Sequence, residues 1–587
     1  MHTGGLFLTT PLISTKVFSP ENFTDIHREF RQAMEDFARK EIRPHKEAIE
    51  KFDKTLSLKL IKKCGELGFL GVDIPESYGG LGLDKITSTL LAEKIADAQT
   101  ESFTVTYFVH VGIGTLPIVY FGSEELKRRY LPKIASGEWL SAYALTEPEA
   151  GSDALSLQSH ARLSDDGKFY ILNGNKQFIS NGSWAKVLIT FAKINGDKLT
   201  GFIIDPESPG VTRKEEKNKL GLHGSSTCNI ILENVQVPKE NMLGEIGKGA
   251  DIALNILNIG RFKLGAAVLG GCKNAIELSC QYGFQRRQFG QPIARFDAIQ
   301  KKIAEMAIHT YALESIVYHT AHQIDEALQE VDEKSPFYSQ EIARAIEKLA
   351  IECSICKVYG SESYWNIADE TLQIFGGYGC IEDFPPARML RDTRVDRIYE
   401  GTNEINRQVI VGYLIKKTLL EELPIRETIK LLSKTDLPAI RLETTDLLKN
   451  EKRAVERAKQ LTLMLFGDCL TRWGQDLLNQ QQIGETLSDM ISILYILNTT
   501  LARITQNTAH AHFPMLLQVG QALTAQKIQE IIRQAHLLLP AIYHGHALQK
   551  AKNKVNQFTK EMDLSTDIFS MRQKIAEYVY KQKKYPF

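Results

Sequence analysis

The chain has 587 residues, with 71 Lys plus Arg residues balanced by 71 Asp plus Glu residues, and 43% of it is hydrophobic. This length is too great for one ordinary domain, and it allows large buried cores that need no disulfide or metal to hold them. The even charge balance excludes a general nucleic-acid binder, which is usually basic overall.

The first twenty residues contain neither a basic segment followed by a long apolar core nor an Arg-rich amphipathic pattern. They therefore show no secretion or transit signal. The chain also lacks a run of 18 apolar residues, which would predict a membrane-spanning helix. Its eight cysteines are sparse and irregularly spaced, as is typical of a reducing compartment. We expect a cytoplasmic protein with no visible targeting segment.

Residues 20 to about 142 show a helical pattern. Ser19 is expected to cap the first helix and Pro20 to occupy its first turn. A further helix is expected to begin near Asp84, after a turn rich in glycine. The first helix is predicted to bury one stripe of apolar side chains, which recur every three or four residues: Phe23, Ile26, Phe30, Met34 and Phe37.

The pattern changes near Thr146 to short runs rich in β-branched and aromatic residues. Gly, Asn, Asp and Pro separate these runs, which predicts strands joined by turns in antiparallel style. The block ends near Pro238. The runs that carry the prediction are residues 169–171, 187–191, 202–204 and 230–232.

Helical spacing returns after about residue 250 and continues to the end of the chain. We therefore expect a mainly α protein with an inserted β domain, because a β block between helical blocks argues against a doubly wound sheet. The predicted segments are an N-terminal helical domain, a middle β domain, a helical bundle and a C-terminal helical extension: residues 1–142, 143–250, 251–415 and 416–587.

No metal site is predicted. Cys353 and Cys356 form a single Cys-x-x-Cys pair, and no second pair follows at zinc spacing. Both are expected to be small buried residues on a helix. His510 and His512 form a close pair without further ligands at suitable spacing, so we expect them at the surface.

The segment from Tyr143 to Asp153 reads Tyr-Ala-Leu-Thr-Glu-Pro-Glu-Ala-Gly-Ser-Asp. It is a strand edge that runs into a turn of small and hydroxyl-bearing residues. Such a turn exposes backbone N–H groups and hydroxyls to a planar polar ligand, although an ordinary capped loop has the same composition. The chemistry of the segment alone leaves both possibilities open.

The amino-acid sequence of this segment resembles a signature motif of the acyl-CoA dehydrogenase family. Four further segments resemble the family in the same order: Gln177–Gly182, Gln285–Gly290, Gln373–Gly379 and Arg397–Glu404. The resemblance covers about residues 20 to 412. Five ordered motifs over that length make a chance match very improbable, whereas a single Gly-Gly-x-Gly would carry little weight.

The resemblance implies an FAD cofactor between the β domain, there barrel-like, and the bundle, with a second subunit completing its site. Phe178 is a ring that can stack on the flavin, and Ser180 can hydrogen-bond it. Arg286 supplies the planar cation that suits a pyrophosphate, and Gly376 lets backbone approach it closely. The full set of implied FAD contacts is Tyr143, Leu145, Thr146, Ser152, Phe178, Ser180, Arg286, Gln288, Phe289, Phe296, Gln373, Gly376, Gly377, Thr402, Asn403 and Glu404.

Glu400 is the implied catalytic base, which removes the α-proton of an acyl thioester. A carboxylate in a dry site becomes a stronger base because desolvation raises its pKa. One branch of the family places its base at the position that matches Gly260, and glycine cannot act as a base. The implied acyl-CoA contacts are Ser152, Asn258, Arg261 and Gly401; Asn258 stands where some members carry Asp.

The implied function is FAD-dependent dehydrogenation of acyl-CoA, the first step of fatty acid β-oxidation, with electrons passed to an electron-transfer flavoprotein. Two alternatives stay open: an acyl-CoA oxidase that uses oxygen, and a largely non-enzymatic assembly relative. Val105 and Val109 align with polar residues that close the acyl pocket in medium-chain members, which favours long acyl chains here. Alternatively, the two valines are ordinary core residues of a helix and do not line an acyl pocket.

Residues 416–587 resemble the extension of very-long-chain members, which are dimers, so a homodimer is expected. A cluster of apolar residues predicts a helix buried on more than one side. The last 47 residues are net positive and contain Phe569, Tyr578, Tyr580 and Phe587. They suit peripheral contact with an anionic membrane, or equally a solvated tail. The helix cluster consists of Ile491, Ile493, Leu494, Ile496 and Leu497.

Overall fold

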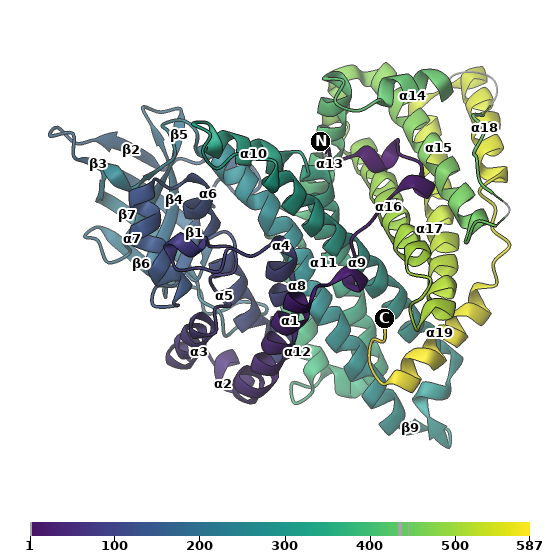
Figure 1. Ribbon diagram of the computed structural model, residues 1–587, viewed down its shortest axis with the longest axis horizontal. Coiled ribbons are helices and arrows are strands. Elements are labelled where there is room, and N and C mark those ends of the chain that lie inside the picture. Colours follow the sequence, from purple (N-terminus) through teal and green to yellow (C-terminus); the bar gives the residue numbers. More distant parts are fainter. Residues whose placement is uncertain (1–2, 433–436, 444) are drawn as a thin grey trace.

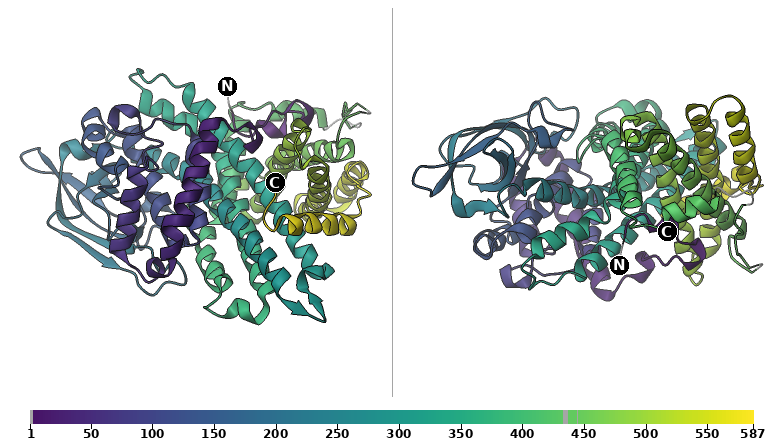
Figure 2. Two further views of the ribbon diagram at one scale, coloured as in Figure 1. Left: turned by 60° about the horizontal axis from the view of Figure 1, so that its bottom comes forward. Right: turned by 90° about the horizontal axis from the view of Figure 1, so that it is seen from above.

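The computed structural model describes residues 3–432, 437–443 and 445–587. A mixed sheet lies at one end of an elongated molecule, long helices form its middle, and further helices form the other end (Figure 1). The N-terminal helices cover one side of the sheet and pack against the central helices (Figure 2). The architecture is therefore mainly α with an inserted sheet, as the sequence predicts.

Seven α-helices form the N-terminal part. Ser19 caps only a single turn of 3-10 helix, Pro20–Asn22, and α1 begins later because Thr24 accepts a hydrogen bond from the His27 N–H. Ile26 is 53% exposed, so the predicted stripe is wrong at this one position. The prediction near Asp84 is confirmed, since its side chain caps α4. The helices are α1 (Asp25–Phe37), α2 (Lys46–Glu50), α3 (Lys54–Glu66), α4 (Lys85–Lys94), α5 (Glu101–Val111), α6 (Leu116–Phe121) and α7 (Glu124–Ala135).

The sheet contains eight strands in the order β6-β7-β3-β2-β4-β5-β8, with β1 also paired to β4. Most pairs are antiparallel, but β1 and β2 both run parallel to β4, so the expectation of a purely antiparallel sheet is wrong. Parallel pairing needs a long crossover, which short-range turn patterns do not reveal. The strands are β1 (Ser141–Ala144), β2 (His160–Leu163), β3 (Phe169–Ser180), β4 (Val187–Ile194), β5 (Lys198–Ile204), β6 (Val211–Glu215), β7 (Thr227–Pro238) and β8 (Met242–Leu243).

Two of the central helices, α8 and α9, are very long. Helix α8 also packs closely against α11. Gly265 and Gly360 permit this approach, because a Cβ added to Gly360 would lie 3.2 Å from the Gly265 Cα. A small hairpin, β9 (Arg287–Gln288) and β10 (Gln291–Pro292), projects from the end of α8. The helices are α8 (Gly249–Gln285), α9 (Asp297–Gln329), α10 (Tyr338–Glu347), α11 (Ala350–Phe375), α12 (Pro385–Thr393) and α13 (Asn403–Leu419).

Two stretches are long and apolar enough to cross a membrane by composition alone, Glu101–Phe121 and Gly249–Gln285. Their apolar windows are 94% and 89% buried inside the protein. Both therefore serve as core helices of this fold in the structure.

The C-terminal extension packs against the central helices as a second helical layer. The predicted cluster around Ile491 and Leu494 is buried in α16, which contacts α9, α13 and α17. The predicted limit at residue 415 lies inside α13, which carries the chain from one layer to the other. The helices of the extension are α14 (Ile425–Leu432), α15 (Lys449–Trp473), α16 (Gln481–Gln506), α17 (Phe513–Ile542), α18 (Gly545–Lys560) and α19 (Ile568–Gln582).

Residues 3–22 run along both the extension and the central helices, although they were grouped with the N-terminal helices (Figure 1). The Gly5 N–H donates to Glu352 of α11, and the Phe18 N–H donates to His319 of α9. The Leu12 N–H donates to Glu456 Oε1 at 2.8 Å, and Arg503 of α16 forms an ion pair with Glu21 at 2.8 Å. The two ends of the sequence are thus held together by buried polar contacts. The sequence contains no local signal for contacts between such distant residues.

Of the four aromatic residues predicted to suit membrane contact, three pack within the protein: Tyr578, Tyr580 and Phe587. Tyr580 is buried, and Tyr578 stacks on Phe587 with ring centroids 6.1 Å apart. Only Phe569 of the four is largely exposed, at 78%. Membrane contact through this segment stays a prediction, which co-sedimentation with anionic vesicles at low and high salt would test.

Candidate active site

Glu400 lies on a short loop between a turn of 3-10 helix, Arg394–Arg397, and α13. Its φ is 58°, a left-handed conformation that is uncommon for any residue with a side chain and often marks a functional position. Thr402 caps α13 by accepting from the Ile405 N–H. The Asn406 amide donates to the carbonyls of Gly401 and Thr402 at 2.8 and 3.0 Å, and these bonds hold the loop.

The carboxyl group of Glu400 rests directly over Gly260 of α8. A Cβ added to Gly260 would lie 2.6 Å from Glu400 Oε2 and 2.9 Å from Oε1, so any larger residue would displace the carboxyl. Oε2 is buried and has no hydrogen-bond partner in the described part of the protein. Burial raises the pKa of Glu400 to about 7, although the cations Arg261 and Lys357 oppose the rise. This carboxyl is therefore poised to accept a proton near neutral pH.

Two buried cations flank the loop of Glu400. Arg261 lies one residue after Gly260; its Nη1 donates to Asn258 Oδ1 at 2.8 Å, and its Nε donates to the Glu400 carbonyl at 3.3 Å. Lys357 of α11 donates to the Gly401 carbonyl at 2.8 Å. Burial lowers the pKa of Lys357 to about 7. Sequence reasoning missed Lys357, since a single lysine within a long helical segment belongs to no motif.

The end of β1 and the end of β3 bring together the first group of predicted FAD contacts. Leu145 and Thr146 follow β1, and the Gln177 N–H donates to the Thr146 carbonyl at 2.9 Å. Phe178 has a φ of 58° and is 59% exposed. A large apolar ring held outward in a strained backbone conformation suits stacking on a planar ligand.

Lys176 is buried beneath this surface and holds its shape. Its Nζ donates to Glu147 Oε1 at 2.6 Å and to the Phe191 carbonyl at 2.8 Å. The turn that Glu147 begins carries Ser152, which is exposed. The hydroxyl-bearing turn is therefore fixed from below by a buried ion pair, as a preformed binding surface requires.

A second group of predicted FAD contacts surrounds a cavity of about 830 Å³ at the far end of α8 and α11. Arg286 lies over the Tyr378 ring at 5.5 Å, and Phe289 of the hairpin is 93% exposed with a φ of 50°. A Cβ added to Gly376 or Gly377 would meet nothing within 4 Å, so this backbone is open to a ligand. Gln288 and Phe296 also line the cavity, and Gln373 is exposed one turn before Gly376.

These two groups do not meet within one chain. The hairpin β9–β10 lies at the lower right of the view, far from β3 and the sheet at the left (Figure 1). The side chain of Asn403, predicted to bind FAD, is buried: Lys357 donates to its Oδ1 at 2.7 Å, and its Nδ2 donates to Glu362 Oε1 at 3.1 Å. Thr402 and Glu404 lie beside it on the loop and the first turn of α13, and Glu404 is exposed.

Another cavity, of about 310 Å³, lies between the start of α8 and α10. The cations Lys248 and Arg344 line it together with the acids Glu245, Asp251 and Glu347. Asn255 also lines it, and its Oδ1 is buried without a partner among the described residues. Asn255 and Asn258 lie one turn apart on α8 and lead toward Gly260. Sequence reasoning missed the two cations, which lie about 100 residues apart.

The comparisons with known proteins agree with this architecture. Models of the acyl-CoA dehydrogenase N-terminal, middle and C-terminal domains match residues 24–138, 142–235 and 247–414. A probable acyl-CoA dehydrogenase of Bacillus subtilis is 41% identical over 589 residues, which cover 100% of this chain and 98% of that protein. The chain belongs to the acyl-CoA dehydrogenase family, a family of oxidoreductases.

Three further relatives match this chain over different shares of its length. The crystal structure of an acyl-CoA dehydrogenase from Bacillus anthracis, complexed with FAD, superposes with a TM-score of 0.96 at 40% identity and full coverage of both chains. Butyryl-CoA dehydrogenase from Megasphaera elsdenii matches 67% of this chain and 99% of its own, with a TM-score of 0.60 at 35% identity. The rat very long-chain specific mitochondrial enzyme is 38% identical over 58% of this chain and 51% of its own length.

Proposed function

We propose that this protein oxidises the α–β bond of acyl-CoA thioesters with FAD as cofactor and Glu400 as the base. The observation that carries the proposal is the buried carboxyl of Glu400, whose pKa is raised to about 7 and whose Oε2 has no partner in the described part of the protein. An unpartnered acceptor in a desolvated position is costly, and a proton from a substrate would satisfy it.

The chain supplies the proton transfer and the binding. Glu400 accepts the α-proton, and the backbone N–H of the same loop is suited to donate to the thioester oxygen as negative charge develops there. Bound FAD would supply the acceptor for the hydride that leaves the β-carbon.

The residues present fit FAD if two copies of the chain share it. Phe178 and the Thr146 segment would hold the flavin ring, while Arg286, Phe289 and the open backbone at Gly376 would hold the pyrophosphate of the neighbouring subunit's cofactor. One chain cannot bring these two surfaces together (Figure 1). This separation supports a homodimer, with each FAD bound by both subunits.

Replacing Arg286 by alanine is therefore expected to weaken FAD retention and subunit association together. Losing one partner of a desolvated charge pair costs about 2–5 kcal/mol. Flavin absorbance per chain and the mass from light scattering measure the two effects. Arg287→Ala is the matched control, because the exposed side chain of Arg287 bonds the Gly290 carbonyl of its own hairpin. Unchanged flavin content and mass in Arg286→Ala would contradict the assignment.

The preferred substrate is proposed to be a long-chain acyl-CoA. Val105 and Val109 of α5 are both buried in the apolar core that also contains Ile259 and Leu264 of α8. An apolar floor allows an alkyl tail to enter further, and each buried methylene contributes about 0.8 kcal/mol. Turnover across saturated acyl-CoAs of increasing length tests this. A maximum at four to eight carbons would refute it.

An electron-transfer flavoprotein is the proposed electron acceptor, and fatty acid β-oxidation the proposed role. An acyl-CoA oxidase is the second candidate, since it shares the resemblance on which the first is based. Stopped-flow reoxidation of the reduced enzyme by oxygen and by the flavoprotein separates them. Faster reoxidation by oxygen would assign the oxidase.

The rate of dehydrogenation should rise with pH through about 7, because only ionised Glu400 accepts a proton and its pKa is raised to about 7. Above about pH 7, ionisation of Glu400 should cause no further change in the rate of dehydrogenation. The pH dependence of kcat/KM measures this ionisation in the free enzyme. A limb centred near pH 4.5 would show that the base is a solvated carboxyl.

Gly260→Ala should lower kcat by about 10²-fold, because the new methyl group displaces the Glu400 carboxyl over which it lies. The fold should persist or gain stability, since Ala is favoured over Gly inside a helix by about 1 kcal/mol. Gly412→Ala is the control, because its Cβ makes only an ordinary contact 3.6 Å from Leu478. Equal kcat in the two variants would show that the carboxyl position is unimportant.

A further inference from the structure

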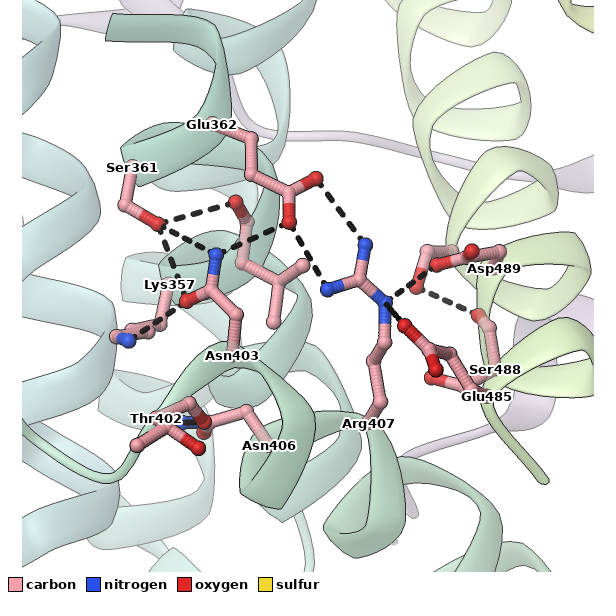
Figure 3. A network of polar contacts seen from close by, with 12 residues as sticks. Lys357, Ser361, Glu362, Thr402, Asn403, Asn406, Arg407, Glu485, Ser488 and Asp489 are labelled. Atoms are coloured by element: carbon pink, nitrogen blue, oxygen red, sulfur yellow. Dashed lines mark hydrogen bonds and ion pairs between the residues drawn. The ribbon is translucent and has the colours of Figure 1, made fainter. Parts of the chain in front are cut away.

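Arg407 joins the catalytic layer to the C-terminal extension. It lies on α13, about one turn beyond the loop of Glu400, and binds acids from two other helices (Figure 3). Its Nη1 and Nη2 bond the two carboxylate oxygens of Glu362 on α11 at 2.9 and 3.1 Å. Its Nε donates to Asp489 Oδ1 of α16 at 2.7 Å. This guanidinium therefore holds a fixed orientation only while both helices are in place.

The same network continues from Glu362 to the loop of Glu400. Glu362 Oε1 accepts from Asn403 Nδ2 at 3.1 Å, and Asn403 Oδ1 accepts from Lys357 Nζ at 2.7 Å. Lys357 then donates to the Gly401 carbonyl at 2.8 Å, next to Glu400. An unbroken chain of hydrogen bonds thus runs from the extension to the loop (Figure 3).

The middle of this chain is shielded from water. Asn403, Lys357 and Ser361 are all buried, and Ser361 donates to Asn403 Oδ1 at 3.3 Å. Buried polar groups must keep their partners, because an unpaired one pays the full cost of desolvation. A change at one end is therefore passed along the network rather than absorbed by solvent.

We propose that Asp489, which belongs to the extension, is a positioning residue for Glu400 and acts through Arg407, Glu362, Asn403 and Lys357. The inference rests on the role of Glu400 proposed above and deepens it. The extension would then form part of the catalytic architecture, in addition to its packing against α9 and α13. Without the charge of Asp489, the hydrogen bond from Arg407 Nε would weaken, and the remaining acid of α16 would be Glu485, whose Oε1 lies 3.9 Å from Nε. The guanidinium could then rotate toward Glu485 and draw Glu362 away from Asn403.

The direction of the effect follows from the charges around Glu400. Arg261 and Lys357 face it as cations, and both oppose the rise of its pKa. The phenols of Tyr143 and Tyr399 also face it, and burial followed by the charge of Glu400 raises the pKa of Tyr143. Loosening Lys357 weakens one of the two cations, so the pKa of Glu400 should rise further.

The test is Asp489→Asn, which keeps the shape of the side chain and removes its charge. We expect kcat to fall about tenfold, as couplings within one polar network allow. The acid limb of kcat/KM should move up by about 0.5–1 pH units. Hydrogen exchange of peptides spanning residues 397–404 should become faster, which reports on the loop without turnover. Asp489→Glu retains the charge and should restore most of the rate and the limb.

Arg572→Gln is the matched control. Arg572 of α19 forms an ion pair with Glu305 of α9, so it also links the extension to the body but lies outside the network. Arg572→Gln should leave unchanged both the acid limb of the kcat/KM profile and the rate of hydrogen exchange in residues 397–404. The proposal is overturned if Asp489→Asn leaves both unchanged, or if Arg572→Gln shifts them equally. Glu400→Gln in the same assay separates the two proposals: full activity there would refute the base itself, whatever Asp489→Asn shows.

Discussion

Glu400→Gln is expected to lower the rate of acyl-CoA dehydrogenation by about 10⁴-fold, the upper range for removing a general base. The amide is nearly isosteric with the carboxyl that lies over Gly260, but it cannot accept the α-proton. Flavin binding should persist, because the surfaces around Phe178 and Arg286 do not include this side chain. Stopped-flow absorbance after mixing with acyl-CoA should show an almost unchanged oxidised flavin spectrum.

Glu421→Gln provides the control for this variant. Glu421 is also a glutamate with a left-handed backbone, φ 56°, but it is exposed at the other end of α13 and pairs with Arg426 at 3.1 Å. After mixing with acyl-CoA, the flavin of Glu421→Gln should be bleached at the wild-type rate. Rapid bleaching by Glu400→Gln would remove Glu400 from the mechanism.

Ending the chain at Leu420 is expected to cause aggregation rather than yield a smaller working enzyme. The truncation exposes the faces of α9 and α13 that α16 covers and removes α16 itself, together with the buried ion pair of Arg503 with Glu21. Exposing apolar area equal to four buried leucines costs roughly 6–12 kcal/mol, comparable with the whole stability of a domain. Solubility after expression and light scattering of any soluble fraction measure the outcome.

Relatives that lack the extension remain folded, so the faces covered here must differ in this chain or be covered otherwise. Our proposal is that the extension also prevents assembly beyond a dimer. Higher assemblies of the truncated chain would support that part. A soluble truncated dimer with full flavin content and unchanged turnover would contradict both the packing role and the link through Asp489.

Local patterns predicted the elements of this fold well where the determining contacts are short in range. Asp84 caps α4 because a side-chain oxygen meets an N–H three residues later, which a sequence shows directly. The strand ending at Pro238 and the buried cluster of α16 were equally visible. Parallel pairing of β1 with β4 and the docking of residues 3–22 on the extension depend on partners 40 to 490 residues away.

The candidate site shows the same division. The sequence motifs singled out Glu400 and Gly260, and in the structure the carboxyl of Glu400 lies directly over Gly260. The motif also assigned Asn403 to FAD, which stays a prediction, and its amide bonds Lys357 and Glu362 within the protein. Lys357 and Asp489 carry no motif, and only the packing of α11 and α16 against α13 gives them a role.

The most direct test of the account is an anaerobic titration of the flavin-loaded protein with a saturated long-chain acyl-CoA, followed by absorbance and by mass spectrometry of the thioester. We predict stoichiometric bleaching of the flavin and an acyl product lighter by two hydrogens. An unchanged spectrum with saturated acyl-CoAs of every length, or a chain that purifies without flavin, would contradict the account and favour a non-enzymatic assembly role.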